Sequence, residues 1–571
     1  MILNLQIHLK MLTCSFLSVA MLWGTAVPLS AQPPVIARVT LSSNRKVEKQ
    51  YLQGDYDATV ATLTKTIAEQ PKQAEAYFLR GIVQITVGKP QEGLADFNQA
   101  IQLDPDLVGV YYQRGLHRLG FDASKSVSAY TEDLKGEAKA AAYAGRGRIY
   151  IALNETEDAI KDLSQAIVLN STDGDSYFLR GQVHRSLKKY DLAIADYTEA
   201  IKLNPESAEV LIERGTAYDL SNQKKLALAD YTKAIELEPD NARAYYNRGV
   251  TQTEAEQKIA DYTQTIELSP QGWFTYLAHN NRGALLRLQG KTEDAIADFS
   301  QAITLSPNYS LAHRNRGLAY SSLNQEQKAV EDFNQTLVLD PADGLAHAAR
   351  GFAYANLNQP QQALEDYNRA IELYPTESRE PDLALVYYNR GLLRAAKDPK
   401  DALKDHTKAI EINPKDPDFY VDRGDVRDRL KDSQGAVEDY TQALKLNDNH
   451  VRAYNNRGVT REQLKDVKGA LADYTNAITH SPEDALAYSN RAALRLREND
   501  LRGAIDDYNQ VIELTPDDAE AYYQRGLAHA KRLDRPTALE DLKKAAALAK
   551  QQENDTLQQQ ALEQIGKVQK P

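Results

Sequence analysis

The chain has 571 residues, of which 26% are charged, and it carries a formal charge of −12. An acidic chain repels a polyanion on average, so the composition argues against a general nucleic-acid binder. The single cysteine, Cys14, excludes an intrachain disulfide framework and a zinc site built on cysteines.

The N-terminal residues have the pattern of an export signal. Lys10 precedes the apolar run 11–27, and the small residue Ala31 stands before a proline-rich start. The pattern predicts a signal peptide at 1–31, a short linker at 32–39 and a mature chain in the bacterial periplasm or outside the cell, without membrane insertion. An uncleaved membrane anchor is the alternative, because an apolar run of this length can barely span a bilayer.

An Arg-Gly pair then recurs along the chain with a nearly constant period. Its second residue is Gly81, Gly115, Gly147, Gly181, Gly215, Gly249, Gly283, Gly317, Gly351, Gly391, Gly424, Gly458, Ala492 and Gly526, and ten of the thirteen intervals are 34 residues. Within each repeat, apolar residues recur at spacings of three and four on two stretches, which predicts two amphipathic helices. A fixed period of this size is typical of stacked units. We therefore expect an all-α fold, an α-solenoid in which antiparallel helix pairs stack into a superhelix.

Residues at set places within the repeat add a family resemblance. Tyr177, the pair Arg180-Gly181, Tyr197, Ala200 and Pro205 mark one repeat, and the same types return in others. This pattern resembles the tetratricopeptide repeat family over residues 40–548, in about fifteen repeats, with Arg where the family usually has Leu before the glycine. The resemblance implies that the first helix of each pair lines a concave groove. Residues 549–571 are predicted to form a capping helix and tail.

A charge pairing is built into the repeat. Arg precedes the glycine place in all fourteen repeats, and Asp precedes the aromatic residue of the second helix in thirteen. Because an unpaired buried charge is costly, we predict structural ion pairs that fix the helix register, such as Arg350 with Asp366 and Arg316 with Asp332. We expect Arg350→Leu to destabilise the fold more than the double change with Asp366→Leu. A ladder of anion or ligand sites is the alternative.

No motif indicates catalysis. His279, His313 and His347 stand one repeat apart, which is too far for them to share a metal ion, so we interpret them as substitutes for packing aromatic residues. The tripeptide 290–292, Gly-Lys-Thr, lacks the earlier glycine and the preceding strand of a phosphate-binding loop. We therefore expect no enzyme activity, no cofactor and no metal site.

The family's ligand-binding places, transferred to this chain, predict a partner-binding groove. The places hold mostly apolar residues in the middle repeats: Leu277, Leu311, Leu318, Leu345, Phe352, Leu385, Tyr388 and Leu392. Further along they hold charged residues: Asp418, Asp425, Asp428, Arg452 and Glu462. An apolar stripe with an acidic end suits a peptide that carries basic and apolar residues. Packing between neighbouring first helices is the alternative for any of the apolar side chains.

The function predicted from these features is a non-catalytic scaffold of the cell envelope that binds one or more proteins or peptides. A co-chaperone that clamps a peptide carboxylate is one alternative. The family members with that role have Lys three residues before the glycine place and Asn directly after it, and no repeat here has either residue. A self-assembling structural protein of the envelope is the other alternative, because exposed end repeats can stack on copies of themselves.

Overall fold

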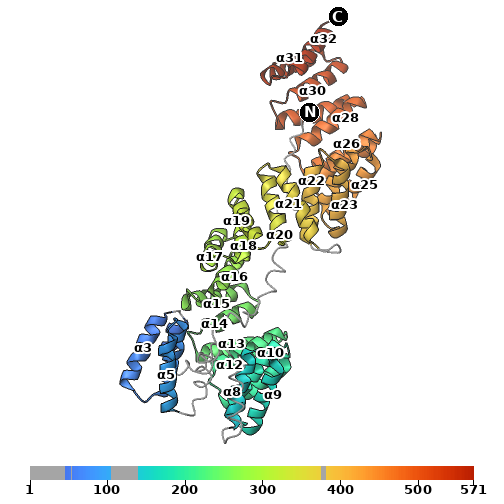
Figure 1. The fold of residues 1–571 in the computed structure, drawn as a ribbon. Coiled ribbons are helices and arrows are strands. Elements are labelled where there is room, and N and C mark those ends of the chain that lie inside the picture. Colours follow the sequence, from blue (N-terminus) through green and yellow to red (C-terminus); the bar gives the residue numbers. More distant parts are fainter. Residues whose placement is uncertain (1–44, 53–54, 105–138, 375–380, 571) are drawn as a thin grey trace. The chain divides into compact units, whose positions relative to one another are not determined.

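The computed structural model describes residues 45–52, 55–104, 139–374 and 381–570, and the regular secondary structure of these residues is helical. The predicted all-α solenoid is confirmed, because helices adjacent in sequence pack side by side in pairs along the described ranges (Figure 1). The predicted signal peptide and linker lie outside the described residues. None of the described helices is both long and apolar enough to span a bilayer.

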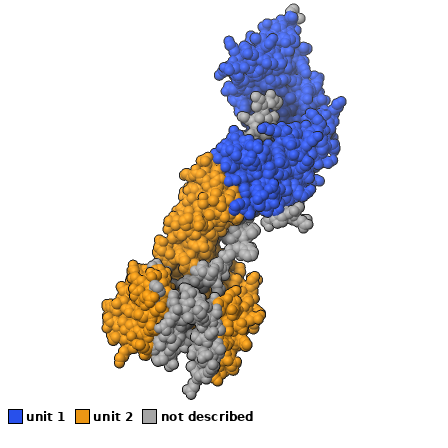
Figure 2. Space-filling model, in the orientation of Figure 1, with its two compact units in different colours: residues 1–18, 341–571 blue, residues 19–340 orange. Residues whose placement is uncertain are grey.

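The described chain divides into two compact units, which Figure 2 colours separately. Even-numbered helices are the first helices of their repeats, and odd-numbered helices are the second. Unit 2 contains α2 (Arg45–Leu52), α3 (Tyr56–Glu69), α4 (Ala74–Thr86), α5 (Pro90–Leu103), α8 (Lys139–Ala152), α9 (Thr156–Leu169), α10 (Gly174–Ser186), α11 (Tyr190–Leu203), α12 (Ala208–Leu220), α13 (Lys224–Leu237), α14 (Ala242–Thr251), α15 (Ala255–Leu268), α16 (Thr275–Leu288), α17 (Thr292–Leu305), α18 (Ser310–Ser322) and α19 (Glu326–Leu339).

Unit 1 begins after residue 340 and contains six further helix pairs and a last single helix. Its helices are α20 (Gly344–Asn356), α21 (Pro360–Leu373), α22 (Pro381–Arg394), α23 (Pro399–Ile412), α24 (Pro417–Arg429), α25 (Ser433–Leu446), α26 (Val451–Gln463), α27 (Val467–His480), α28 (Ala485–Arg497), α29 (Leu501–Leu514), α30 (Ala519–Lys531), α31 (Arg535–Gln551) and α32 (Asp555–Gln569). The last repeat therefore ends at Gln551, a few residues beyond the predicted boundary. Helix α32 then buries Leu557 and Ala561 in the cluster of α30 and α31, which is the packing of a cap.

Local signals explain where the helices of a repeat begin and end. Helix α10 begins after Asp173, whose carboxylate accepts a hydrogen bond from the Ser176 amide and caps the helix. The turn into α11 places Lys188 in the left-handed region, with φ of 58°. Nine further non-glycine residues of the described chain have positive φ, and five of these are asparagine, which tolerates that region better than most residues. Pro205 stands two residues after α11, where it cannot continue the helix.

The glycine place allows the two helices of a repeat to approach closely. A Cβ atom added at Gly458 would lie 2.6 Å from Cε1 of the Tyr474 ring on the second helix. Tyr474 is fully buried, as are most of the aromatic residues at its place. Burying a side chain of this size stabilises the fold by about 1.5–3 kcal/mol, so the glycine contributes by admitting the ring.

Candidate interaction surface

The structure brings together both predicted ion pairs. Arg350 donates from Nε and Nη2 to the two carboxylate oxygens of Asp366, at 2.8 and 2.7 Å. Arg316 makes the same bidentate contact with Asp332, at 2.8 Å for both hydrogen bonds. The same geometry occurs in thirteen described repeats, with donor–acceptor distances of 2.6–3.0 Å. These aspartates are buried, so their carboxylates are satisfied from within the protein and do not form an open anion or ligand site.

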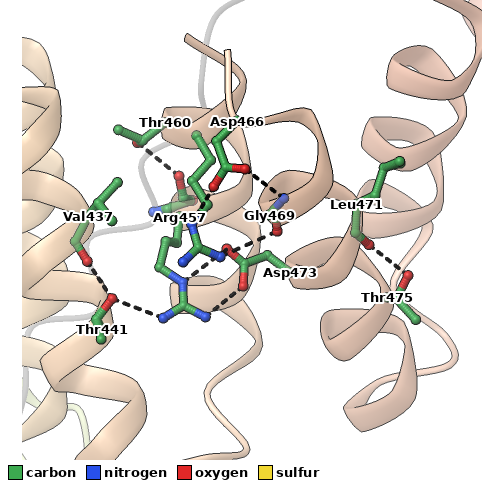
Figure 3. Close-up of polar contacts among 11 residues, drawn as sticks. Val437, Thr441, Arg457, Thr460, Asp466, Gly469, Leu471, Asp473 and Thr475 are labelled. Carbon is green, nitrogen blue, oxygen red and sulfur yellow. Dashed lines mark hydrogen bonds and ion pairs between the residues drawn. The ribbon is translucent and has the colours of Figure 1, made fainter. Parts of the chain in front are cut away.

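Ten of these arginines also reach the preceding repeat. Figure 3 shows Arg457, which binds Asp473 on α27 and donates from Nη1 to the Thr441 hydroxyl on α25, at 3.0 Å. Nine other arginines of this place bind a Ser, Thr or Asn side chain in the same way: Arg80, Arg180, Arg214, Arg248, Arg282, Arg316, Arg390, Arg491 and Arg525. One guanidinium thus joins the two helices of its own repeat to the second helix of the repeat before it. The sequence signal for this bond is a Ser, Thr or Asn directly after the aromatic place, a position outside the predicted ion pairs.

The three histidines bind the same carboxylates as the arginines. His279 Nδ1 lies 2.8 Å from Asp298, His313 Nδ1 lies 3.3 Å from Asp332, and His347 Nδ1 lies 2.9 Å from Asp366. They therefore do more than replace packing aromatic residues, because they add a hydrogen bond to the ion pair. Within the described ranges, no group of three or more His, Cys, Asp or Glu residues is arranged to hold a metal ion.

These hydrogen bonds set the titration of the buried carboxylates. Burial alone raises the pKa of Asp298, but hydrogen bonds from Arg282 and His279 outweigh it and lower the pKa below its ordinary value. The pKa of Asp366 is lowered for the same reason, by Arg350 and His347. Both aspartates therefore stabilise the folded state while they are ionised, and this stabilisation is lost as the pH falls through their lowered pKa values.

Four places of the first helix form one surface across successive repeats, which we call the first-helix face. They lie six and two residues before the glycine place and one and four residues after it. Arg243 donates to Glu209 at 2.7 Å, and these residues occupy the first of the four places in neighbouring repeats. Arg148 likewise binds Asp175 of the next repeat at 3.3 Å. Contacts between first helices of neighbouring repeats also occur for α16 with α18 and α24 with α26.

Six of the eight predicted groove residues lie on this face and are partly exposed. In unit 2 they are Leu277, Leu311 and Leu318, and in unit 1 they are Leu345, Leu385 and Leu392. The alternative of packing between first helices holds in part, because Leu277, Leu385 and Leu392 also pack against neighbouring clusters.

Phe352 and Tyr388 differ from the other six residues because they are 5% and 3% exposed. The Phe352 ring packs with Ala348, Tyr367 and Val386, where the small alanine leaves room for it. Tyr388 stands three residues before the glycine place, so it lies off the first-helix face and packs against Phe419 of the next repeat. Neither side chain offers surface to a partner in this structure.

Four charged residues of the face in unit 2 form one network. Arg185 binds the fully buried Glu213 at 3.0 Å, and Arg243 binds both Glu213 and Glu209. Burial lowers the pKa of Arg243, but the two glutamates outweigh it and hold the pKa above its ordinary value. This network joins α10, α12 and α14, and truncating one partner would leave a buried charge behind.

In unit 1, the predicted charged end of the groove is also an interconnected network. Arg452 of α26 binds Asp422 and Asp425 of α24. The Tyr440 hydroxyl, from the second helix α25, donates a hydrogen bond to Asp425 at 2.7 Å. Asp422, which stands at the second place of the face, was not among the charged residues predicted from the sequence. Burial and the Asp425 carboxylate raise the pKa of Tyr440, so its hydroxyl stays protonated and donates. His450 Nε2 lies 2.8 Å from Asp418.

Sequence comparison identifies the repeats. Models described as TPR repeat or tetratricopeptide repeat match residues 50–108, 147–187, 174–207, 221–254, 283–324, 345–377, 421–485 and 494–532, which together are more than half of the chain. The chain belongs to the tetratricopeptide repeat family.

One curated protein and two solved structures show how far the likeness to individual proteins extends. A protein SGT1 homolog of Oryza sativa subsp. japonica is 27% identical over 130 residues, which are 23% of this chain and 34% of that protein. The chain thus spans about a third of the length of this curated relative. The APC/C hetero-tetramer Cut9–Hcn1 has a TM-score of 0.35 at 16% identity, covering 84% of this chain and 95% of that one. Yeast Tom70 has a TM-score of 0.29 at 16% identity, covering 72% and 99%.

Proposed function

We propose that this protein is a non-catalytic scaffold of the cell envelope that binds peptide segments or partner helices along its first-helix face. The coarser statement follows from the family: an array of tetratricopeptide repeats is a protein–protein interaction scaffold. The observation that supports the finer proposal is the row of partly exposed leucines. Leu311 and Leu318 in unit 2, and Leu385 and Leu392 in unit 1, stand at the same two places of their repeats.

The energetics of such a surface favour a partner with apolar residues at helical or extended spacing. Each partly exposed leucine that a partner covers contributes at roughly 25 cal/mol per Å² of apolar area removed from water. Association also costs translational, rotational and side-chain entropy, so a single leucine is too little to hold a partner. A row of leucines on successive helices supplies several contacts to one segment, which is how grooves of this kind gain affinity.

The envelope setting is supported by the N-terminal pattern alone. Lys10, the apolar run 11–27 and Ala31 have the order of an export signal. The mass of the purified chain from its native cells tests this part of the proposal. A mature N-terminus at Gln32 is the expected result, and a chain that keeps residues 1–31 would support the membrane anchor instead.

Affinity capture from an envelope extract tests the binding surface. The face variants are Leu311→Glu with Leu318→Glu in unit 2 and Leu385→Glu with Leu392→Glu in unit 1. Matched controls are Leu226→Glu and Leu446→Glu, because these leucines are exposed but stand on the second helices α13 and α25. A protein retained by the controls and lost from a face variant supports the proposal. Equal retention by every variant, or no specific capture, would contradict it.

A further inference from the structure

Two acidic side chains on the first-helix face of unit 1 share one arrangement. Asp425 accepts a hydrogen bond from the Tyr440 hydroxyl at 2.7 Å and from Arg452 Nη2 at 2.6 Å. Glu462 accepts from the Tyr474 hydroxyl at 2.6 Å and from Arg497. In both cases the tyrosine comes from the second helix of the same repeat, and the arginine comes from the first helix of the next repeat.

The two hydrogen-bond partners of each carboxylate differ in their exposure to solvent. Tyr440 and Tyr474 are buried, so the hydrogen bonds they donate are fixed parts of the fold. The Arg452 and Arg497 side chains are 48% and 61% exposed. An ion pair exposed to this degree contributes little stability, because water and salt compete with it. Arg452 also binds the buried Asp422, which accepts a second hydrogen bond from the Tyr388 hydroxyl at 2.5 Å and so has another partner within the fold. The tyrosine that binds each carboxylate is therefore a permanent partner, and the arginine is a replaceable one.

The surrounding surface is acidic and apolar. On the face of α24 and α26, Arg452 is outnumbered by acidic residues: Asp418, Asp422, Asp425, Asp428 and Glu462. Arg497 stands on α28, one residue beyond the fourth place of the face, and reaches Glu462 from there. Val459 and Leu486 are exposed on the same face, and Leu385 and Leu392 are partly exposed on α22. A partner segment with basic and apolar side chains complements both properties.

Two described repeats of unit 2 lack this arrangement. On α17 and α19 of unit 2 the aromatic place holds Phe299 and Phe333, which have no hydroxyl to donate. The first-helix face there holds Leu311 and Leu318 in place of the carboxylates. The carboxylates of α24 and α26 thus occur in repeats whose aromatic place holds a tyrosine, and the tyrosine hydroxyl can donate a hydrogen bond to them.

We propose that Arg452 and Arg497 occupy, in the free chain, the two positions that cationic side chains of a bound partner take. The partner is a protein segment with arginine or lysine residues among apolar ones, and its cations displace the two arginines from Asp425 and Glu462. This inference rests on the proposed function, because it assigns the partner chemistry of the same face. It reverses the usual expectation for mutagenesis, since removal of an arginine from this surface strengthens binding.

Fluorescence anisotropy on the full-length chain tests the inference. The probe is a labelled helical peptide of Arg, Leu and Ala, and its twin has Glu in place of each Arg. Arg452→Ala and Arg497→Ala are each expected to bind the arginine peptide about fivefold more tightly, the effect of removing one competing exposed ion pair. Arg369→Ala is the matched control for net charge, because Arg369 is equally exposed and pairs with Glu372 on α21, off the face. Asp425→Asn added to Arg452→Ala is expected to abolish the gain.

The outcomes separate the inference from the proposed function. If the Arg452 and Arg497 variants bind no more tightly than Arg369→Ala, or if the glutamate peptide gains equally, the displacement is refuted. In that case the Leu385→Glu variant tests the proposed function separately. If the wild-type chain binds the peptide and Leu385→Glu abolishes that binding, the first-helix face still binds a partner. Absence of binding of either peptide to every variant contradicts the inference as well. Circular dichroism of each variant shows whether it folds, and two independent arginines keep the test valid if one variant does not.

Discussion

The Arg–Asp pair makes a quantitative prediction about stability. Arg214 and Asp230 test it more cleanly than Arg350 and Asp366, because His347 also binds Asp366 whereas Leu211 stands in the histidine's place beside Arg214. Arg214 donates to the Asp230 carboxylate twice, at 2.8 Å for both bonds. Arg214→Leu leaves a buried carboxylate without its cation, which costs about 3–5 kcal/mol.

The double change should restore most of that stability. With Arg214→Leu and Asp230→Leu together, no charge remains buried and two apolar side chains fill the site, so we expect a net loss near ~1 kcal/mol. Asp230→Leu alone should cost less than Arg214→Leu, because the arginine side chain is partly exposed and can turn to water. The three variants then form a double-mutant cycle with a large coupling energy.

Hydrogen exchange resolved by mass spectrometry is the appropriate assay, because a long repeat array opens locally and does not unfold in one step. Protection of the α12 and α13 amides should fall roughly 150- to 5000-fold in Arg214→Leu, the conversion of 3–5 kcal/mol at about 1.36 kcal/mol per tenfold. In the double variant it should fall about fivefold. If the double variant loses as much protection as the two single variants combined, the pair is not coupled and the reasoning is wrong.

Three further predictions concern single repeats. Burial lowers the pKa of His406 from 6.5 to about 4, and neither ring nitrogen has a hydrogen-bond partner within the described chain. Between pH 6.5 and 4 the unfolded state therefore binds a proton that the folded state does not bind. The free energy of opening of α22 and α23, measured as exchange protection, should fall by about 3 kcal/mol over this range. His406→Phe should remove this pH dependence. Leu533 has φ of 64° and is 83% exposed, so Leu533→Asn should raise the exchange protection of α30 and α31 by about 1 kcal/mol, whereas no gain would show that the turn is unstrained. Gly458→Val should cost about 1–3 kcal/mol through collision with Tyr474, and Gly458→Ala should cost less, since Ala492 fills the same place; equal losses in exchange protection would refute the steric reason.

Much of the architecture could be predicted from the sequence because the repeat supplies the same evidence many times. The Arg-Gly pair and its period determined the helix pairs and the family, and the constant spacing from Arg350 to Asp366 placed the two charges together. The hydroxyl or amide that completes each arginine's contacts was also visible, as in Thr441 after Tyr440, but it joins neighbouring repeats and no spacing within one repeat indicates it.

The candidate surface was less predictable, because exposure depends on side-chain size and on neighbours from other helices. Phe352 and Leu392 stand at equivalent places, yet Phe352 is buried and Leu392 is partly exposed, since the larger ring reaches back to Ala348. The charged end posed a different problem. Its residues appeared in the sequence as free charges, and only the structure shows Arg452 bridging Asp422 and Asp425.

Site-specific photo-crosslinking in the native cells tests the central claim, that partners bind along the first-helix face. A photoreactive amino acid is placed at Leu311 or Leu385 on the face, or at Leu226 or Leu446 on the second helices. We expect crosslinks to the same partner from the two face positions and none from the two controls. Crosslinks from the second-helix positions, with none from the face, would contradict the account and move binding to the opposite side of the repeats.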